Sequence, residues 1–327
     1  MPGTDPLEAA RMVIGELPRL PHLPELPERG AGADMIGRTA GLLVDLAVEL
    51  VPSGYRVTAR PGRDHRRSID LLRRDLDALE EAVAVAGAHP RVIKVQAAGP
   101  WTLAAGVELR SGHTVLTDAG AVAEFAASLA EGLRGHVAEI SRRLGARTVV
   151  QLDEPGLPAV LAGGVPTPSG FGTVPPVPEA SAVERLRGVL DTLPAPRIVH
   201  CCAPRPPLEL LRRAGAQALA IDAGLLAGAP RATLDALGEI WDAGIVVLLG
   251  LVPAQPPAAF PSLVDLARPL LELVERLGLD PAVLAERCVP TPSCGLAGAP
   301  MGWAKQALTL ARELGQALLD PPVSWSP

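Results

Sequence analysis

Histidine and cysteine stand close together in the segment Arg197–Pro204, which reads RIVHCCAP. Successive side chains of a β-strand point to opposite faces, so His200 and Cys202 share one face and Cys201 points to the other. Imidazole and thiolate are the ligands that zinc prefers, and a catalytic zinc site leaves one position open or exchangeable. The pair therefore predicts two ligands of a metal ion. The alternative is a hydrogen-bonded core histidine beside buried thiols.

Three more polar residues lie at, or just after, the end of a strand-like segment. Asp153 and Asp222 each end a segment, and Cys294 follows another. In a (β/α)8 barrel the active site is built at the carboxyl ends of the strands, so these side chains would converge on His200. The positions favour a metal site over scattered core residues. Cys288 begins its segment, so we expect it at the opposite end of the barrel.

Short β-branched segments alternate with longer segments rich in Ala and Leu, which indicates βα units and a parallel sheet. Ser68 and Asp118 are the expected N-caps of two helices. The predicted strands are Arg56–Arg60 (the weakest), Val92–Ala98, Thr148–Asp153, Ile198–Cys202, Ala218–Asp222, Ile245–Gly250 and Cys288–Thr291. The predicted helices are Ser68–Ala86, Asp118–Leu144, Ala182–Leu193, Pro207–Ala214, Arg231–Ala243, Ser262–Leu277 and Met301–Leu319.

These elements predict an α/β fold of the (β/α)8, or TIM barrel, type, with the first strand missing or truncated because only seven strands are found. The chain of 327 residues fits one such domain over residues 1–327. The proline clusters at Leu17–Arg29, Pro158–Pro178 and Pro253–Pro261 are read as long loops. Within the second, Gly163–Pro178 is expected to be either a lid or a disordered insertion.

Composition narrows the class of partner. The net charge is -6 with acidic and basic residues interleaved, so neither nucleic acid nor a membrane surface is an expected partner. No segment is long and apolar enough for a membrane span or a signal peptide, and we expect a cytoplasmic protein. Four cysteines are a poor disulfide framework for this length. The remaining histidines are expected to be solvated: His22, His65, His89, His113 and His136.

Four segments carry a family resemblance: VQLDEPGLP at 150–158, IVHCCAP at 198–204, ALAID at 218–222 and PTPSCGLAG at 290–298. They resemble the C-terminal catalytic barrel of cobalamin-independent methionine synthase, whose stretches read approximately Q-x-D-E-P-A, H-x-C, I-x-x-E and P-D-C-G-L-K. The resemblance covers about residues 90 to 320. It implies a barrel of the wider superfamily that also contains uroporphyrinogen decarboxylase.

The resemblance implies roles for individual residues. His200, Cys202 and Cys294 match the zinc ligands, and Asp222 falls where the family has a glutamate ligand. Asp153 matches the carboxylate that holds the amino group of homocysteine. In the segment AGPWTL (98–103), which resembles a T-G-P-x-T turn, Gly99 and Trp101 are expected to shape the substrate pocket, although a core position is also open to Trp101. Glu154 is expected to be a structural partner.

The expected reaction follows from a zinc-bound thiol. Zinc deprotonates a coordinated thiol, and the thiolate attacks an electrophilic methyl group. We therefore expect a methyltransferase that uses a small thiol, homocysteine first, and makes methionine. Two departures from the family bear on the methyl donor: the N-terminal half of the family protein has no counterpart, and Gln255 stands where the family has a proton-relaying histidine. Gln cannot transfer a proton, so a corrinoid protein is considered beside a folate.

Two other functions stay open at this stage. The first is a related zinc-dependent alkyl transferase of the epoxyalkane:coenzyme M type, although Asp153 suits an ammonium group better than a sulfonate. The second is a barrel that keeps the zinc site without catalysis. The family's T-I-G-S segment, which grips the carboxylate of homocysteine, has no match before MPGTDP at the start of the chain.

Overall fold

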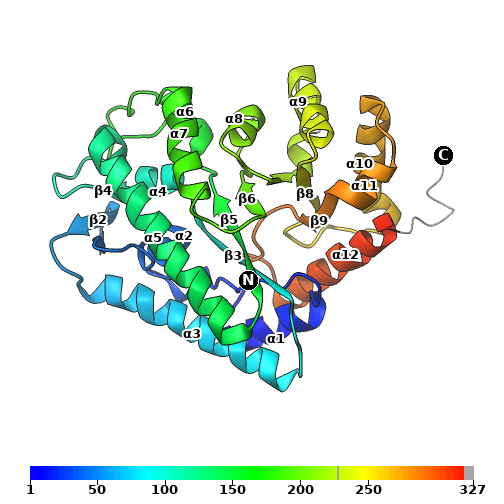
Figure 1. Ribbon diagram of the computed structural model, residues 1–327, viewed down its shortest axis with the longest axis horizontal. Coiled ribbons are helices and arrows are strands. Elements are labelled where there is room, and N and C mark those ends of the chain that lie inside the picture. The colour runs from blue at the N-terminus through cyan, green and yellow to red at the C-terminus, as the bar shows by residue number, and fades with distance from the viewer. Residues whose placement is uncertain (227, 320–327) are drawn as a thin grey trace.

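The computed structural model describes residues 1–226 and 228–319, and its centre is a parallel sheet that curls into half a barrel (Figure 1). The strand order follows the chain, β3-β5-β6-β7-β8-β9, so each strand pairs with the next. The strands are β3 (Val92–Ala98), β5 (Arg147–Asp153), β6 (Arg197–His200), β7 (Ala218–Asp222), β8 (Val246–Val252) and β9 (Cys288–Pro292). The six strands of the sheet confirm the predicted segments from Val92 onward.

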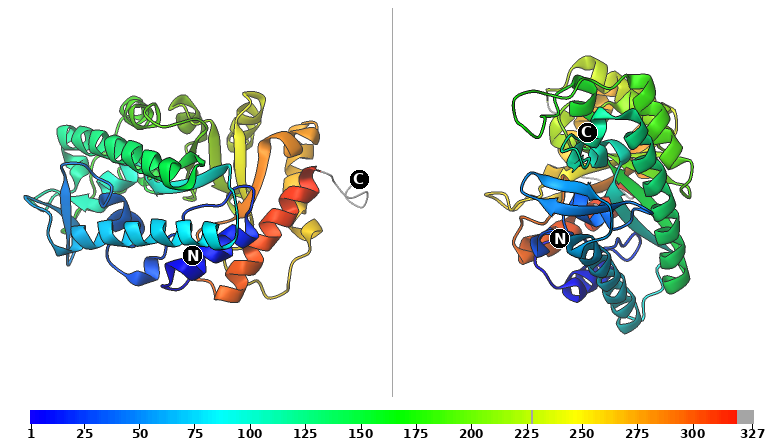
Figure 2. Two further views of the ribbon diagram at one scale, coloured as in Figure 1. Left: turned by 60° about the horizontal axis from the view of Figure 1, so that its bottom comes forward. Right: turned by 90° about the vertical axis from the view of Figure 1, so that its left-hand side faces the viewer.

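Helices cover the convex side of this sheet (Figures 1 and 2). Their buried faces form the main hydrophobic core with alternate strand residues such as Ile93, Leu152 and Val199. The helices are α1 (Pro6–Glu16), α2 (Met35–Ala40), α3 (Arg63–Val85), α4 (Pro100–Gly106), α5 (Ala119–Leu144), α6 (Leu157–Ala162), α7 (Glu179–Leu190), α8 (Leu208–Arg213), α9 (Arg231–Asp242), α10 (Leu263–Leu277), α11 (Ala282–Arg287) and α12 (Met301–Leu319).

The expected eight-stranded barrel is confirmed only in its α/β character and its curled parallel sheet, since six parallel strands are found in the described part of the chain. A seventh position is occupied by the segment 21–25, which pairs beside β3 through a single bridge between His22 and Lys94. Pro21 and Pro24 have no N–H to donate, which explains why the pairing does not continue as a strand. The expected domain of residues 1–327 includes residues 227 and 320–327, which lie outside the described residues.

The two edges of the half-barrel are linked by α1 and α12. The amino group of Met1 donates to the carbonyl of Glu25 at 2.6 Å, beside β3. At the other end of α1, Glu16 accepts hydrogen bonds from Thr309 and Arg312 of α12, which packs against β9. The N-terminal helix thus connects the first and last parts of the sheet.

A second, three-stranded sheet lies beside the half-barrel (Figure 2). It contains β1 (Ala47–Val51), β2 (Gly54–Thr58) and β4 (Val107–Glu108), and β1 pairs antiparallel with β2. The expectation of a barrel strand at Arg56–Arg60 is therefore wrong. Its residues belong to a hairpin, because Gly54 at φ 136° turns the chain back on β1.

The start of α3 also differs from the expected one. The helix begins at Arg63, and Ser68 lies inside it, with its hydroxyl donating to the carbonyl of Asp64. The carboxylate of Glu49 on β1 instead accepts from the first-turn amides of Asp64 and His65, at 3.1 and 3.3 Å. The expected cap at Asp118 is confirmed, since it accepts from Gly120 and Ala121.

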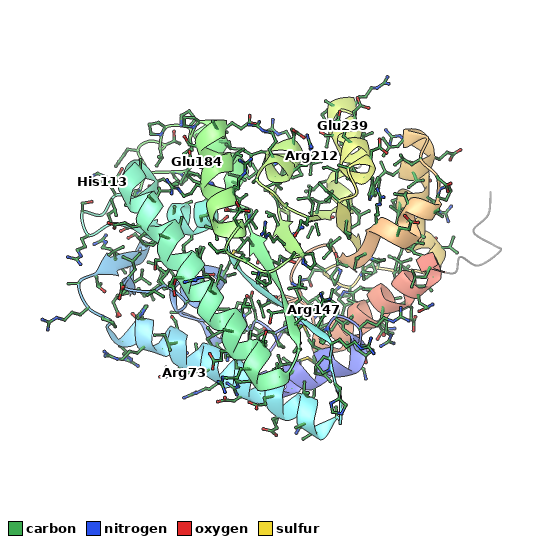
Figure 3. All side chains as sticks on the ribbon, viewed as in Figure 1. Arg73, His113, Arg147, Glu184, Arg212 and Glu239 are labelled. Carbon is green, nitrogen blue, oxygen red and sulfur yellow. The ribbon has the colours of Figure 1, made fainter. Side chains whose placement is uncertain are left out.

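Two of the histidines expected in solvent are buried. His65 on α3 is 5% exposed and His136 on α5 is 6% exposed. Burial and the nearby charge of Arg38 lower the pKa of His136 to about 3, so this side chain is neutral. Each of the two helices packs a stripe that includes its histidine against the core. By contrast, charged residues such as Arg73, Glu184 and Glu239 project from the outer helices (Figure 3).

The concave face of the sheet is divided into two layers. Toward the amino ends of the strands, small and branched apolar side chains pack together: Val149, Ile198, Ala218, Ala220 and Leu248, with Val92, Val246 and Val289 against them. Toward the carboxyl ends the same face carries half-buried polar side chains, which include Gln151, His200 and Asp222. Among the described residues, no helix has the length and apolar character needed to cross a membrane.

Candidate metal centre and acceptor site

His200 ends β6, and its ring is oriented by the neighbouring strand. Its Nδ1 lies 2.9 Å from the carbonyl oxygen of Ala220, which requires the ring proton to sit on Nδ1. Burial, followed by the charge of Lys94, lowers the pKa of His200 against the opposing effects of Ala220, Cys294 and Asp222. A neutral ring protonated at Nδ1 leaves the lone pair of Nε2 free, which is the form that binds a metal ion.

The thiols of Cys202 and Cys294 lie close enough for each to shift the pKa of the other, although 91 residues separate them in the chain. The interaction with Cys294, followed by burial, raises the pKa of Cys202. It also lowers the pKa of Cys294, because a thiolate there accepts a hydrogen bond from its partner. The carboxyl ends of β6 and β9 therefore bring two thiols together on the concave side.

Gly250 makes this approach possible. A side chain at this position on β8 would place its Cβ 2.6 Å from the Cα of Ser293 and 3.2 Å from the Cα of Asp222. Both distances are shorter than ordinary carbon contacts, so a larger residue would push the segment after β9 away. The close packing is fixed further by the amide of Ser293, which donates to the carbonyl of Val252 at 2.8 Å.

Asp222 ends β7 beside this pair. Its Oδ1 accepts from the amide of Gly224 at 2.8 Å, which leaves Oδ2 available. The carboxylate is near enough to influence the pKa values of both His200 and Cys294. As the side chains stand, however, no three His, Cys, Asp or Glu residues within 1–226 and 228–319 form a group that could hold a metal ion. The donor types suit zinc, and metal binding would require these side chains to draw together.

The other two cysteines lie apart from the thiol pair. Cys201 is fully buried in the core on the convex side of the sheet, as the strand alternation predicts. Cys288 begins β9 and is buried in the same core. Burial raises the pKa of each thiol, to about 11 for Cys201 and about 12 for Cys288. Neither thiol is available as a ligand.

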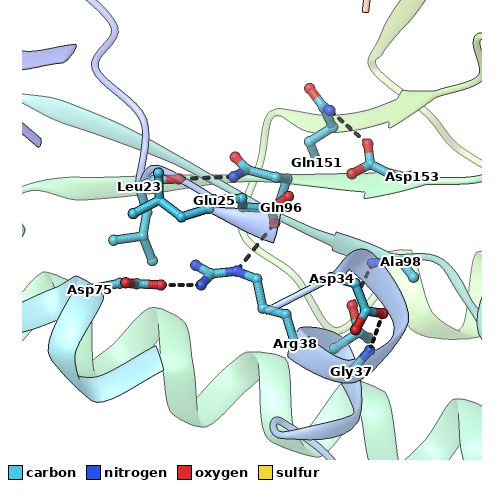
Figure 4. A network of polar contacts seen from close by, with 12 residues as sticks. Leu23, Glu25, Asp34, Gly37, Arg38, Asp75, Gln96, Ala98, Gln151 and Asp153 are labelled. Carbon is cyan, nitrogen blue, oxygen red and sulfur yellow. Dashed lines mark hydrogen bonds and ion pairs between the residues drawn. The ribbon is translucent and has the colours of Figure 1, made fainter. Parts of the chain in front are cut away.

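Asp153 ends β5 in register with His200 and is 7% exposed. Burial and the charge of Glu25 raise its pKa to about 7, against the lowering effects of Lys94 and Gln151. Glu25 was missed in the sequence because it lies in a proline-rich segment interpreted as a loop. Arg38 holds it, with Nε 3.2 Å from Glu25 Oε1 (Figure 4). Two carboxylates therefore act on the same part of the concave face.

Glu154 points to the opposite side of β5, as expected, and caps α4. Its carboxylate accepts from the amides of Trp101 and Thr102 at 3.0 and 2.7 Å. A Cβ at Gly99 would lie 2.3 Å from Glu154 Oε1, so this glycine gives the carboxylate room. Trp101 is buried in the core, with Nε1 donating to the carbonyl of Ala182. Substrate contacts of Gly99 and Trp101 stay predictions.

Gln255, in the loop after β8, lies beside the segment that follows Cys294. A Cβ at Gly298 would be 3.0 Å from Gln255 Nε2. Its amide side chain therefore faces the loop that carries one of the candidate ligands. An amide donates and accepts hydrogen bonds but does not exchange a proton at neutral pH.

The sequence matches the model of the cobalamin-independent synthase catalytic domain over residues 1–317. The chain belongs to this family. The matched range covers nearly the whole chain and includes the candidate site residues Asp153, His200, Cys202 and Cys294. No curated protein matches.

Among solved structures, a B12-independent methionine synthase from Shewanella sp. W3-18-1, in complex with selenomethionine, has a TM-score of 0.50 and 12% identity. The match covers 84% of this chain and 74% of that chain, and it supports the fold. The 3-keto-D-glucoside 4-epimerase YcjR from E. coli has a TM-score of 0.36 and 11% identity, with 73% and 84% covered. A putative lyase/mutase from Burkholderia cenocepacia J2315 has a TM-score of 0.33 and 14% identity, with 98% and 92% covered.

Proposed function

We propose that this chain is a zinc-dependent methyltransferase whose acceptor is a small amino-acid thiol, homocysteine first, and whose product is then methionine. The observation that carries the proposal is that the thiols of Cys202 and Cys294, which follow β6 and β9, lie close enough to shift each other's pKa in a cobalamin-independent synthase catalytic domain. His200, with Nε2 free, and Asp222, with Oδ2 free, supply the other two ligands. The unit proposed to act is the single domain of residues 1–327.

Zinc, when bound, supplies a positive charge that keeps a coordinated thiol deprotonated and nucleophilic at neutral pH. The residues of the chain do the rest. Ala220 holds the ring of His200 in the tautomer that a metal ion requires. Two cysteine thiolates and the carboxylate of Asp222 make the site negative, so a further thiolate bound there stays electron-rich.

Asp153, with Glu25 near it, is proposed to bind the ammonium group of the acceptor. The raised pKa of Asp153, about 7, reflects a buried carboxyl that lacks a full counter-charge. An ammonium group beside it would stabilise the ionised form. The same carboxylates would repel a sulfonate, which disfavours a coenzyme M type of acceptor. If the protein binds zinc but no thiol reacts, the alternative of a zinc-binding barrel without catalysis is supported.

The methyl donor is tested in the same experiment, in which methyltetrahydrofolate and methylcobalamin are each supplied with homocysteine. The family is consistent with a folate donor, and none of the comparisons supports a corrinoid protein as partner. We expect the purified chain to contain about one zinc per molecule, because the four proposed ligands form a single site. Methionine formed with either donor supports the methyltransferase.

Substitutions at two neighbouring cysteines provide a matched pair of variants that test metal binding. Cys202→Ser is expected to lose zinc and all methionine formation. Cys201→Ala, one residue away and on the other face of the sheet, is expected to retain both. Full zinc content and full activity in Cys202→Ser, or in His200→Ala, would refute the proposed site. Metal analysis of the purified variants, with circular dichroism to establish folding, decides the question.

A further inference from the structure

A line of hydrogen bonds connects Lys94 to Asp153 across two strands. Lys94 Nζ donates to Gln151 Oε1 at 3.1 Å. Gln151 Nε2 donates in turn to Asp153 Oδ1 at 2.7 Å (Figure 4). The same ammonium donates to Gln96 Oε1 at 3.1 Å. Gln96 is anchored in turn, because its Nε2 donates to the carbonyl of Leu23 at 2.8 Å.

This arrangement fixes the orientation of Gln151. A lysine ammonium has only donors and an ionised carboxylate has only acceptors, so the amide of Gln151 fits between them in one way. Turned over, it would place its NH2 against the ammonium and its oxygen against the carboxylate. Lys94 therefore fixes the orientation of the Gln151 amide, and that amide in turn fixes the position of Asp153 Oδ1.

Lys94 itself is held by neutral groups. Within residues 1–226 and 228–319, no carboxylate oxygen lies within 4.0 Å of Lys94 Nζ, and its contacts are the two glutamine oxygens. Direct pairing with Asp153 would neutralise that carboxylate and leave little attraction for another cation. With Gln151 between them, the two charges stay apart and Asp153 keeps Oδ2 free of any hydrogen bond seen in the described chain.

We infer that Gln151 and Lys94 are positioning residues that hold Asp153 by one carboxylate oxygen, so that the other oxygen receives the ammonium group of the acceptor thiol. The inference rests on the proposed function for the identity of the acceptor. Gln151 and Lys94 touch neither the thiol nor the methyl group in this scheme. They increase the preference of the enzyme for a thiol that carries an amino group over one that does not.

The test compares two acceptors that differ only in the amino group, homocysteine and 4-sulfanylbutanoate. Gln151→Met keeps the length of the side chain and removes both of its hydrogen bonds. We expect its KM for homocysteine to rise about tenfold or more, because hydrogen bonds to charged groups are the strong ones. Its kcat should change less than about twofold, and its KM for 4-sulfanylbutanoate should not change. Lys94→Met is expected to act in the same direction.

Gln96→Met is the matched comparison, because Gln96 contacts Lys94 in the same way but makes no hydrogen bond to Asp153. It should raise the KM for homocysteine by less than Gln151→Met does. In an Asp153→Asn background, Gln151→Met should produce no further loss of selection between the two acceptors. Equal losses for both acceptors in Gln151→Met would overturn the inference, since they would indicate a general structural effect.

Failure of the proposed function would be distinguishable. If the wild-type protein methylated neither thiol, the methyltransferase would be refuted, and a crystal structure of Gln151→Met would then test the positioning role. We expect the Asp153 carboxylate to change rotamer in that structure. An Asp153 side chain unchanged in position, with Gln151 removed, would overturn the positioning role by itself.

Discussion

Glu154 Oε2 lies 2.7 Å from the amide nitrogen and 2.7 Å from the hydroxyl of Thr102. Together with the amide of Trp101, these groups give a fully buried carboxylate three donors, two of them amides of the first turn of α4. The start of this helix is thus held by a side chain from β5 rather than by a local cap. The turn that carries Gly99 is fixed to the strand that carries Asp153.

Replacing Glu154 by Ala is expected to lower the free energy of unfolding by about 3 to 5 kcal/mol, because it leaves buried donors without acceptors. Glu154→Gln keeps one acceptor oxygen and should lose less. Urea unfolding followed by circular dichroism measures both. Equal stability of the Ala variant and the wild type would show that the cap contributes little.

The buried carboxyl of Asp153 predicts a pH dependence of stability. Its pKa is about 7 when folded and near 3.8 in an unfolded chain, so the folded state binds the extra proton between these values. Its contribution is therefore complete below about pH 4 and is lost as the pH rises to about 7. We expect Asp153→Asn, which cannot ionise, to gain about 3 kcal/mol relative to the wild type between pH 5 and pH 8.

Urea midpoints of the two proteins at pH 5 and pH 8 check this expectation. Asp70→Asn, at an exposed position on α3, is the control and should shift with pH as the wild type does. A difference between Asp153→Asn and the wild type that stays constant across this range would place the pKa of Asp153 elsewhere.

Arg38 links the buried carboxylate of Asp75 to the half-buried carboxylate of Glu25, since it lies 2.5 Å from Asp75 Oδ2 and 3.2 Å from Glu25 Oε1. Arg38→Met is expected to cost about 1 to 3 kcal/mol of stability, because Glu25 loses its partner and Asp75 keeps its pairing with Arg29, at 2.7 Å. Arg38→Lys should cost less, although a single ammonium cannot bridge both groups as the guanidinium does. Arg73→Met, an exposed arginine on α3, should stay within about 0.5 kcal/mol of the wild type. Denaturant unfolding compares the three variants.

Gln255 predicts a donor-dependent effect. Gln255→His introduces a group that transfers protons near neutral pH, and acid catalysis of this kind is worth about 100-fold or more where it operates. We therefore expect faster methionine formation with methyltetrahydrofolate and no change with methylcobalamin. Gln255→Asn is the control that introduces no proton donor of this type. A Gln255→His protein that forms methionine no faster with the folate would show that residue 255 takes no part in activating the donor.

Much of the half-barrel could be predicted because its signals are local. The strand Val92–Ala98 and the helix Met301–Leu319 have the predicted bounds, since a β-branched segment and an apolar helical stripe each mark their own limits. The cap at Asp118 is equally local. The start of α3 could not be predicted in this way, because its capping carboxylate, Glu49, comes from a strand 14 residues earlier.

The residues of the candidate site also differ in whether local sequence could predict them. His200, Cys202, Asp222 and Cys294 were found because each follows a recognisable strand, and their joint binding of zinc stays a prediction. Glu25 was missed because prolines hide the strand-like pairing of its segment beside β3. The burial of His65 and His136 was missed because helix periodicity does not say which polar residue will face the core.

Alternation along β5 gives the adjacent acids Asp153 and Glu154 separate tasks on opposite faces of one strand. A slip of β5 by a single residue would exchange them, which would direct the glutamate to the concave face of the sheet and the aspartate toward α4. The shorter carboxylate would not span to the first turn of that helix as Glu154 does. The order Asp-Glu therefore specifies the register of β5, since only one register places the shorter carboxylate on the concave face and the longer one at the start of α4.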